Sequence, residues 1–188
     1  MKKNNIILLL IFVLALLVCS CEDKYEMPYN PGVNVDVESF NKHKELWNNS
    51  GVKNYSYTYK WKGSYSPTAC IIADVKVTDG KVDYVLKQLE LHKGNEITED
   101  DKSYFEIFIG NKENLLIENL YKEMQTDIES DYQSYSENPD CYYANFTFDF
   151  SDNLPFILSY KNESCLMKEY LVGNYGYIEI EIENFVEN

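Results

Sequence analysis

The chain has 188 residues, with 17 basic residues against 31 acidic ones, and its formal net charge is −14. All 17 basic residues are lysines. Since binding to nucleic acid needs clustered positive charge, this composition excludes a general affinity for nucleic acid, and the lack of arginine excludes a bidentate guanidinium clamp. The hydrophobic share of 45% and the length predict one folded domain.

The first 20 residues have the pattern of a lipoprotein signal peptide. A basic start with Lys2 and Lys3 precedes an unbroken apolar run over 6–18, which is shorter than the roughly 20 residues that a helix needs to cross a bilayer. The residues Val18-Cys19-Ser20-Cys21 resemble a bacterial lipobox, in which a small residue precedes the lipidated cysteine. We therefore expect acyl chains such as palmitate on Cys21, and the alternative is a plain signal peptide that is cut nearby.

A lipid on Cys21 would hold the protein on a membrane without spanning it. We therefore expect a lipid-anchored protein of the bacterial outer membrane or cell surface, with its domain in the periplasm or outside. Glu22 and Asp23 resemble the acidic export tag of surface lipoproteins, or they stand there by chance in an acidic protein.

The segment behind the anchor contains Pro28 and Pro31-Gly32 and shows little periodicity. These features are typical of a flexible tether, which we expect over 21–37. A single domain is then expected over 38–188.

The first half of this domain reads as a helix followed by three strands. Phe40 and Trp47 recur at helical spacing after Ser39, a candidate N-cap, and Gly51 supplies the stop. Asp79-Gly80 is a strong hairpin signal. The segments predicted as strands by alternation or β-branched content are 53–61, 70–77 and 82–89.

The second half begins with a helical pattern over 97–130, which Gly110-Asn111 divides in two. The apolar residues that recur at three- and four-residue spacing are Tyr104, Phe105 and Phe108, and then Leu116, Leu120, Met124 and Ile128. Thr98 and Asp101 have the spacing of a capping box, although 104–109 could also be a short strand. A loop is expected over 132–140. The four segments that then read as strands are 142–150, 156–160, 165–170 and 177–185, with turns at 151–153, 161–163 and 173–174 between them.

Strands and helices that do not alternate one by one are typical of the α+β class. The sequence therefore predicts an α+β domain with an antiparallel sheet, in the order helix, three-strand meander, helices and about four strands. The helices are expected to pack on one face of that sheet.

Three motifs resemble a family of uncharacterised bacterial lipoproteins that is defined only as a domain of unknown function. Leu46-Trp47 is followed by Asn54-Tyr55-Ser56-Tyr57 and by Val75-Lys76-Val77-Thr78-Asp79-Gly80-Lys81-Val82, in the family's order. The later segments 116–121, 153–155 and 177–185 are similar to its middle helix, late turn and closing strand. The resemblance covers about 40–185 and implies a fold and a location, but no activity.

One face of the first predicted strand is a row of aromatic side chains, formed by Tyr55, Tyr57, Tyr59 and Trp61. Aromatic faces are favoured in protein interfaces and as platforms for sugars, so this row is a candidate binding face. The alternative is that it forms the inner face of the sheet beneath the helices.

Three cysteines remain besides Cys21, namely Cys70, Cys141 and Cys165. An exported protein can form disulfides, and any one of three pairings is open; we favour Cys141 with Cys165, near the starts of two late strands. A cysteine nucleophile would need a base, and the two histidines, His43 and His92, carry no local motif.

Acidic residues cluster in three places without the spacing of a calcium loop, and two separate histidines make no zinc motif. The clusters are Glu99-Asp100-Asp101, Asp127 with Glu129 and Asp131, and Asp149 with Asp152. Solvated surface charge is the simpler interpretation, and weak calcium binding is the alternative. We expect no catalytic residue, cofactor or metal.

The leading hypothesis is a non-catalytic envelope lipoprotein whose domain binds an envelope protein, a peptide or a glycan. The second hypothesis is an inhibitor-like or envelope-assembly module that acts on another protein. An enzyme that uses cysteine and histidine ranks last.

Overall fold

The computed structural model describes residues 31–63, 70–89, 97–150, 157–168 and 171–188, and the structural statements below concern these residues. They form seven strands, three α-helices and one 3-10 helix. In chain order the elements are β1 (Gly32–Asn34), α2 (Val37–Ser50), β2 (Tyr55–Gly63), β3 (Cys70–Thr78), β4 (Lys81–Leu89), α3 (Glu99–Ile109), η1 (Lys112–Leu115), α4 (Ile117–Glu137), β5 (Tyr142–Phe150), β6 (Ile157–Lys168) and β7 (Leu171–Glu187).

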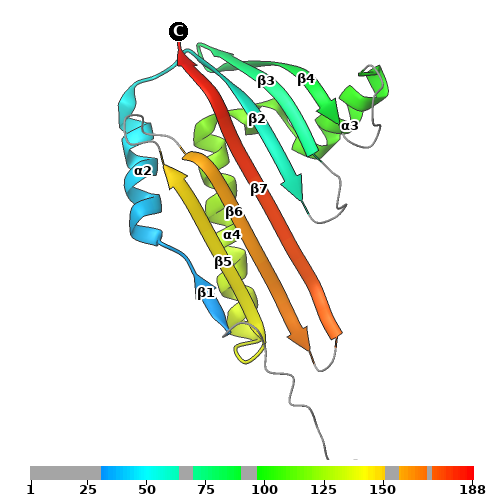
Figure 1. Cartoon of the computed structure of the whole chain (residues 1–188). Helices are drawn as coiled ribbons and strands as arrows, with labels where there is room; N and C mark the ends of the chain where they lie inside the picture. The colour runs from blue at the N-terminus through cyan, green and yellow to red at the C-terminus, as the bar shows by residue number, and fades with distance from the viewer. Residues whose placement is uncertain (1–30, 64–69, 90–96, 151–156, 169–170) are drawn as a thin grey trace, which may run out of the picture.

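The strands form one mixed sheet in the order β1-β5-β6-β7-β2-β3-β4, so the last strand of the chain lies in the middle (Figure 1). The predicted antiparallel sheet is wrong, because β1 runs parallel to β5, with Val33 opposite Ala144. This strand lies in the range 21–37 assigned above to a tether. Three residues are too few to show a periodicity, and the partner strand is more than a hundred residues away, so no local pattern could indicate the pairing.

The predicted pair of strands over 156–160 and 165–170 is a single strand, β6, and the turn predicted at 161–163 is wrong. The polar side chains that suggested a turn have partners within the sheet. Lys161 pairs with Glu163 at 3.0 Å, and Asn162 points to the opposite face, where it donates to Asp131 at 3.0 Å. In the same way, β7 extends through the turn predicted at 173–174.

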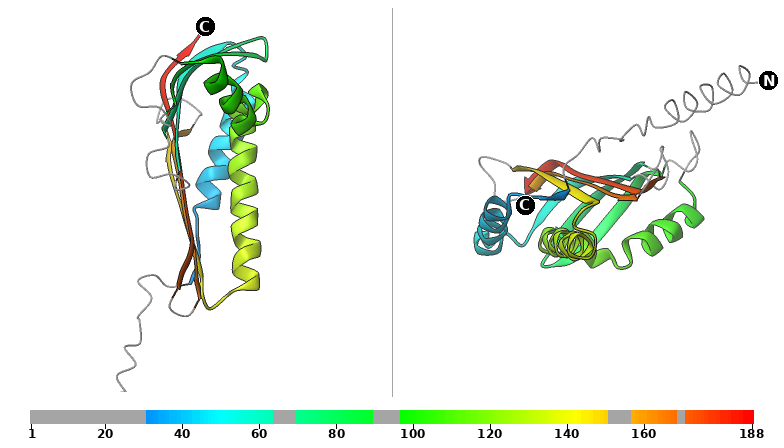
Figure 2. Two further views of the ribbon diagram at one scale, coloured as in Figure 1. Left: turned by 90° about the vertical axis from the view of Figure 1, so that its right-hand side faces the viewer. Right: turned by 90° about the horizontal axis from the view of Figure 1, so that it is seen from below.

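The helices α2, α3 and α4 lie side by side on one face of the sheet (Figure 2). The buried side chains on this face alternate with half-buried ones along β2 and with half-buried or exposed ones along β3, as period two requires. The core between the two layers includes Phe40 and Trp47 of α2 and Leu120 and Met124 of α4, all buried. The burial of this apolar face is the main source of stability that the fold offers.

The helix ends predicted from the sequence are confirmed in part. The capping box of Thr98 and Asp101 is confirmed, with the Asp101 backbone N–H donating to the Thr98 hydroxyl at 3.2 Å. The first helix begins earlier than predicted, because Asp36 rather than Ser39 is the N-cap, and the Asp36 carboxylate accepts from the Ser39 N–H at 2.9 Å. Helix α4 continues to Glu137 through most of the predicted loop.

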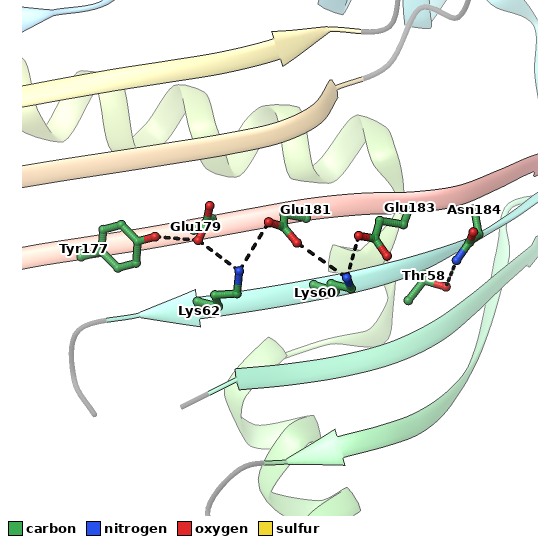
Figure 3. A network of polar contacts seen from close by, with 8 residues as sticks. All are labelled: Thr58, Lys60, Lys62, Tyr177, Glu179, Glu181, Glu183 and Asn184. Atoms are coloured by element: carbon green, nitrogen blue, oxygen red, sulfur yellow. Dashed lines mark hydrogen bonds and ion pairs between the residues drawn. The ribbon is translucent and has the colours of Figure 1, made fainter. Parts of the chain in front are cut away.

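No described helix covers the other face of the sheet. On this open face, lysines of β2 lie beside glutamates of β7 and form a charged ladder (Figure 3). Lys60 lies 2.6 Å from Glu183 and 3.8 Å from Glu181, and Lys62 lies 3.4 Å from Glu181 and 3.3 Å from Glu179. Such cross-strand pairs of opposite charge stabilise the pairing of β7 with β2.

A candidate binding cleft between two helices and the sheet

A cleft of about 870 Å³ opens between α3, α4 and the inner face of the sheet. Its volume lies within the range of about 300–1,000 Å³ that is typical of sites for small ligands. The residues that line it include Tyr59, Trp61, Ile71, Leu89 and Ile178 from four strands, Tyr104, Phe108 and Ile109 from α3, and Asn119, Leu120, Lys122, Glu123 and Thr126 from α4.

The α3 wall of the cleft is aromatic and partly open to solvent. Tyr104 is 48% exposed and Phe108 is 37% exposed, one turn apart on the helix. The helix is held on the sheet by Phe105, which is fully buried and packs edge-on against Tyr84 with ring centroids 5.1 Å apart. The Tyr84 hydroxyl also donates to Glu106 at 2.9 Å. The exposed rings are therefore carried by an anchored helix.

The floor of the cleft is set by Trp61, whose indole lies over Gly63. Phe108 meets the indole edge-on with ring centroids 4.7 Å apart, an arrangement that aromatic pairs favour. Strand β2 and helix α3 thus meet at one aromatic contact, which closes one side of the cleft.

Two charged residues line the cleft in the described part of the chain, and they do not pair with each other. The Lys122 ammonium donates to the Asn119 side chain at 2.8 Å. Glu123 has an exposed side chain, yet the surrounding protein atoms remove part of its hydration and raise the pKa of its carboxyl, and repulsion from Asp127 adds to this. Burial, and next the charge of Glu123, raise the pKa of Tyr59 on the floor.

Glu123 is the first of three acids one turn apart on α4, followed by Asp127 and Asp131. The Tyr160 hydroxyl donates to Asp127 at 2.8 Å, and the Tyr142 hydroxyl donates to Asp131. Burial raises the pKa of both aspartates. The predicted cluster was Asp127 with Glu129 and Asp131, and its interpretation as solvated charge is wrong for Asp131, which is buried. The spacing i, i+4, i+8 of the three acids was the signal that could have indicated a common face.

The predicted aromatic row is the inner face of the sheet, since Tyr55, Tyr57, Tyr59 and Trp61 are all buried. The Tyr55 hydroxyl accepts from the Ile117 N–H at 3.2 Å, where α4 begins without a side-chain cap. The Tyr57 hydroxyl donates to the Leu115 carbonyl. Half of the row thus satisfies backbone groups beneath α4, and the other half, Tyr59 and Trp61, lines the cleft.

Among the described residues, no disulfide joins Cys70, Cys141 or Cys165. Cys165 lies opposite Tyr143, two residues beyond Cys141, so the thiols of the favoured pair are at best diagonal neighbours. Diagonal neighbours are about 7–8 Å apart, whereas the Cα atoms of a disulfide are usually no more than about 6.8 Å apart. A disulfide between Cys141 and Cys165 stays a prediction, which a count of free thiols under oxidising conditions tests.

His43 stacks on Phe150 with ring centroids 3.7 Å apart, and its Nδ1 lies 2.8 Å from the Ser39 carbonyl oxygen. It faces the helix side of the sheet, while Cys165 alternates to the other side. His92 and Cys21 lie outside the described residues.

Within the described ranges, no three side chains of histidine, cysteine, aspartate or glutamate come together in a way that could hold a metal ion. Asp101 serves the capping box and is buried, so solvated charge is the wrong interpretation for it as well. Asp149 is exposed on β5, and Asp152 lies outside the described residues. Among the described helices, none is both long and apolar enough to cross a membrane.

Comparison with known protein families, with curated proteins and with solved structures finds no match to this chain.

Proposed function

We propose that this protein is a lipid-anchored protein of the bacterial cell envelope, and that its domain is a non-catalytic module that binds a partner in the α3–α4 cleft. The observation that carries the proposal is the cleft itself. It has an apolar floor, exposed aromatic rings on one wall and a few polar groups on the other, which is the usual composition of a binding site.

Binding is favoured over catalysis because His43, the histidine among the described residues, stacks on Phe150 and does not line the cleft in which Cys70 lies. A thiol needs a base within hydrogen-bond reach to act as a nucleophile.

The anchor is proposed from the lipobox pattern around Cys21 and from the resemblance to bacterial lipoproteins. Metabolic labelling with a palmitate analogue tests it directly. We expect label on the wild-type chain and none on Cys21→Ala, and a labelled Cys21→Ala variant would contradict the assignment. Protease treatment of intact cells then separates the surface from the periplasm.

Binding in the cleft is tested by a photo-crosslinking amino acid placed at Thr126, at the rim of the cleft. The matched control is the same amino acid at Thr147, an exposed residue of β5 whose side chain alternates to the open face of the sheet. We expect adducts in intact cells from position 126 and not from position 147. Adducts from position 147 alone would favour the second hypothesis, a module that acts on another protein through the open sheet face.

A further inference from the structure

The Glu123 carboxylate is the charged group of the cleft that has neither an ion pair nor a hydrogen bond among the described residues. Its neighbour Lys122, the other charged lining residue, is hydrogen-bonded to Asn119 along the helix. The Glu123 side chain is exposed, but the protein atoms around it remove part of its hydration, and no counter-charge within hydrogen-bond distance replaces that hydration among the described residues.

Nearby charges add to this cost. Asp127, one turn along α4, repels the Glu123 carboxylate, and this repulsion is the second cause of the raised pKa of Glu123, after burial. The whole chain carries a formal charge of −14, so a cation approaching the cleft is attracted over a long range. A positive group beside Glu123 would supply the counter-charge that this carboxylate lacks among the described residues.

The wall that faces α4 suits the rest of such a ligand. Tyr104 and Phe108 expose their rings, and Phe108 continues the aromatic surface onto Trp61. Ring faces attract ammonium groups, and aromatic surface is also a good contact for a chain of methylene groups. A cleft that is lined by both a carboxylate and aromatic rings is therefore suited to a positive charge on an apolar stem.

We infer that the cleft binds a lysine side chain of a peptide segment, with its ammonium group at Glu123 and its methylene stem against Phe108 and Trp61. This inference rests on the proposed function and specifies its partner. A peptide fits better than a free amine because a volume of about 870 Å³ leaves room for residues on both sides of the lysine. A neutral glycan would leave Glu123 without a counter-charge.

The test is fluorescence anisotropy of a labelled pentapeptide, acetyl-Gly-Ala-Lys-Ala-Gly-amide, with the full-length protein in detergent. The norleucine peptide keeps the stem and lacks the charge. We expect it to bind about tenfold more weakly, since tenfold corresponds to about 1.4 kcal/mol, a typical value for a partly desolvated ion pair with an aromatic contact. Competition with n-hexylammonium distinguishes a free amine from a peptide.

Glu123→Gln keeps the size of the side chain, and we expect it to bind the lysine peptide about tenfold more weakly while its binding of the norleucine peptide is unchanged. Glu129→Gln is the matched control, because Glu129 is an exposed acid on the same helix, where it accepts from Gln125 at 2.7 Å. It should bind like the wild type. Circular dichroism of both variants checks that they fold.

Equal binding of the lysine and norleucine peptides would overturn the inference, and so would n-hexylammonium that binds as tightly as the peptide. If neither peptide binds while position 126 still forms adducts in cells, the cleft has a different partner, and the inference fails while the proposed function stands. If position 126 forms no adduct and no peptide binds, both fail.

Discussion

The indole ring of Trp61 occupies the space above Gly63, so that a Cβ atom at position 63 would lie 2.3 Å from the ring. The two residues are neighbours on the same face of β2, because side chains two apart in a strand share a face. A glycine at position 63 therefore lets the indole lie along the sheet and form the floor of the cleft.

Gly63→Ala is expected to destabilise the protein by about 1–3 kcal/mol, the usual cost of overpacking, because the indole must move or the strand must shift. Urea unfolding measures the loss, and a change in near-ultraviolet circular dichroism would report the displaced indole. The control is Lys62→Ala, whose side chain lies on the open face. Equal stability of Gly63→Ala and the wild type would show that the ring has room elsewhere.

The hydroxyl of Tyr121 is buried and has no hydrogen-bond partner in the described structure. Burial also raises the pKa of this hydroxyl. The hydroxyl loses its hydration on folding and gains no hydrogen bond in exchange. We therefore expect Tyr121→Phe, which removes it, to be as stable as the wild type or more stable, by up to about 1 kcal/mol.

Tyr55→Phe is the matched comparison, because the Tyr55 hydroxyl accepts from the Ile117 N–H at the start of α4. This variant leaves a buried donor unpaired, and we expect a loss of about 1–3 kcal/mol. Chemical denaturation of the two variants side by side gives the difference. The same effect in both would mean that the hydroxyl of Tyr121 has a partner in solution.

Asp127→Asn is expected to change how stability depends on pH. Burial raises the pKa of Asp127 above its ordinary value of 3.8. Because the folded protein then binds more protons than the unfolded chain, the contribution of Asp127 to stability is present below that value and is lost as pH rises through the raised pKa. An asparagine still accepts from the Tyr160 hydroxyl and has no such loss.

We therefore expect Asp127→Asn to gain stability relative to the wild type as the pH rises from about 4 to 7. Urea midpoints across this range are the measurement. Asp149→Asn, an exposed aspartate on β5, is the control for a change of charge. A wild-type slope in Asp127→Asn would contradict the raised pKa.

The ion pairs between the lysines of β2 and the glutamates of β7 on the open face of the sheet should contribute little to stability. Lys60 is bound to Glu183 at 2.6 Å, but it is partly exposed, and exposed ion pairs are worth about 0–1 kcal/mol. We expect Lys60→Gln to cost less than about 1 kcal/mol, and the cost to shrink in high salt. Lys87→Gln, which breaks a single exposed pair with Asp74, should cost less. A larger loss that salt does not change would point to a packing role.

Local patterns predicted the elements whose signals are local. The alternation over 53–61 and the hairpin at Asp79-Gly80 gave β2, β3 and β4 within about two residues, and the spacing of Leu120, Met124 and Ile128 indicated the buried side of α4. These patterns rest on periods of 2 and 3.6 residues, and a short window of the sequence is enough to show them.

The sheet order and the cleft depend on contacts between distant segments, so no window could show them. Phe108 was recognised as part of a helical pattern, but that it would meet Trp61 follows only from how α3 crosses the sheet. In the sequence, Glu123 looks like any other acid on the surface of a helix. Only the packing of α4 against the sheet brings it into the same cleft as Phe108 and Trp61.

The position of β7 also bears on when the protein can fold. Residues 171–187 pair with β6 on one side and with β2 on the other, so they join the two halves of the sheet. Its pairings with β2 span more than a hundred residues, and pairings between such distant segments are slow to form. The two halves of the described sheet therefore stay separate until β7 has been synthesised and has paired with both β6 and β2.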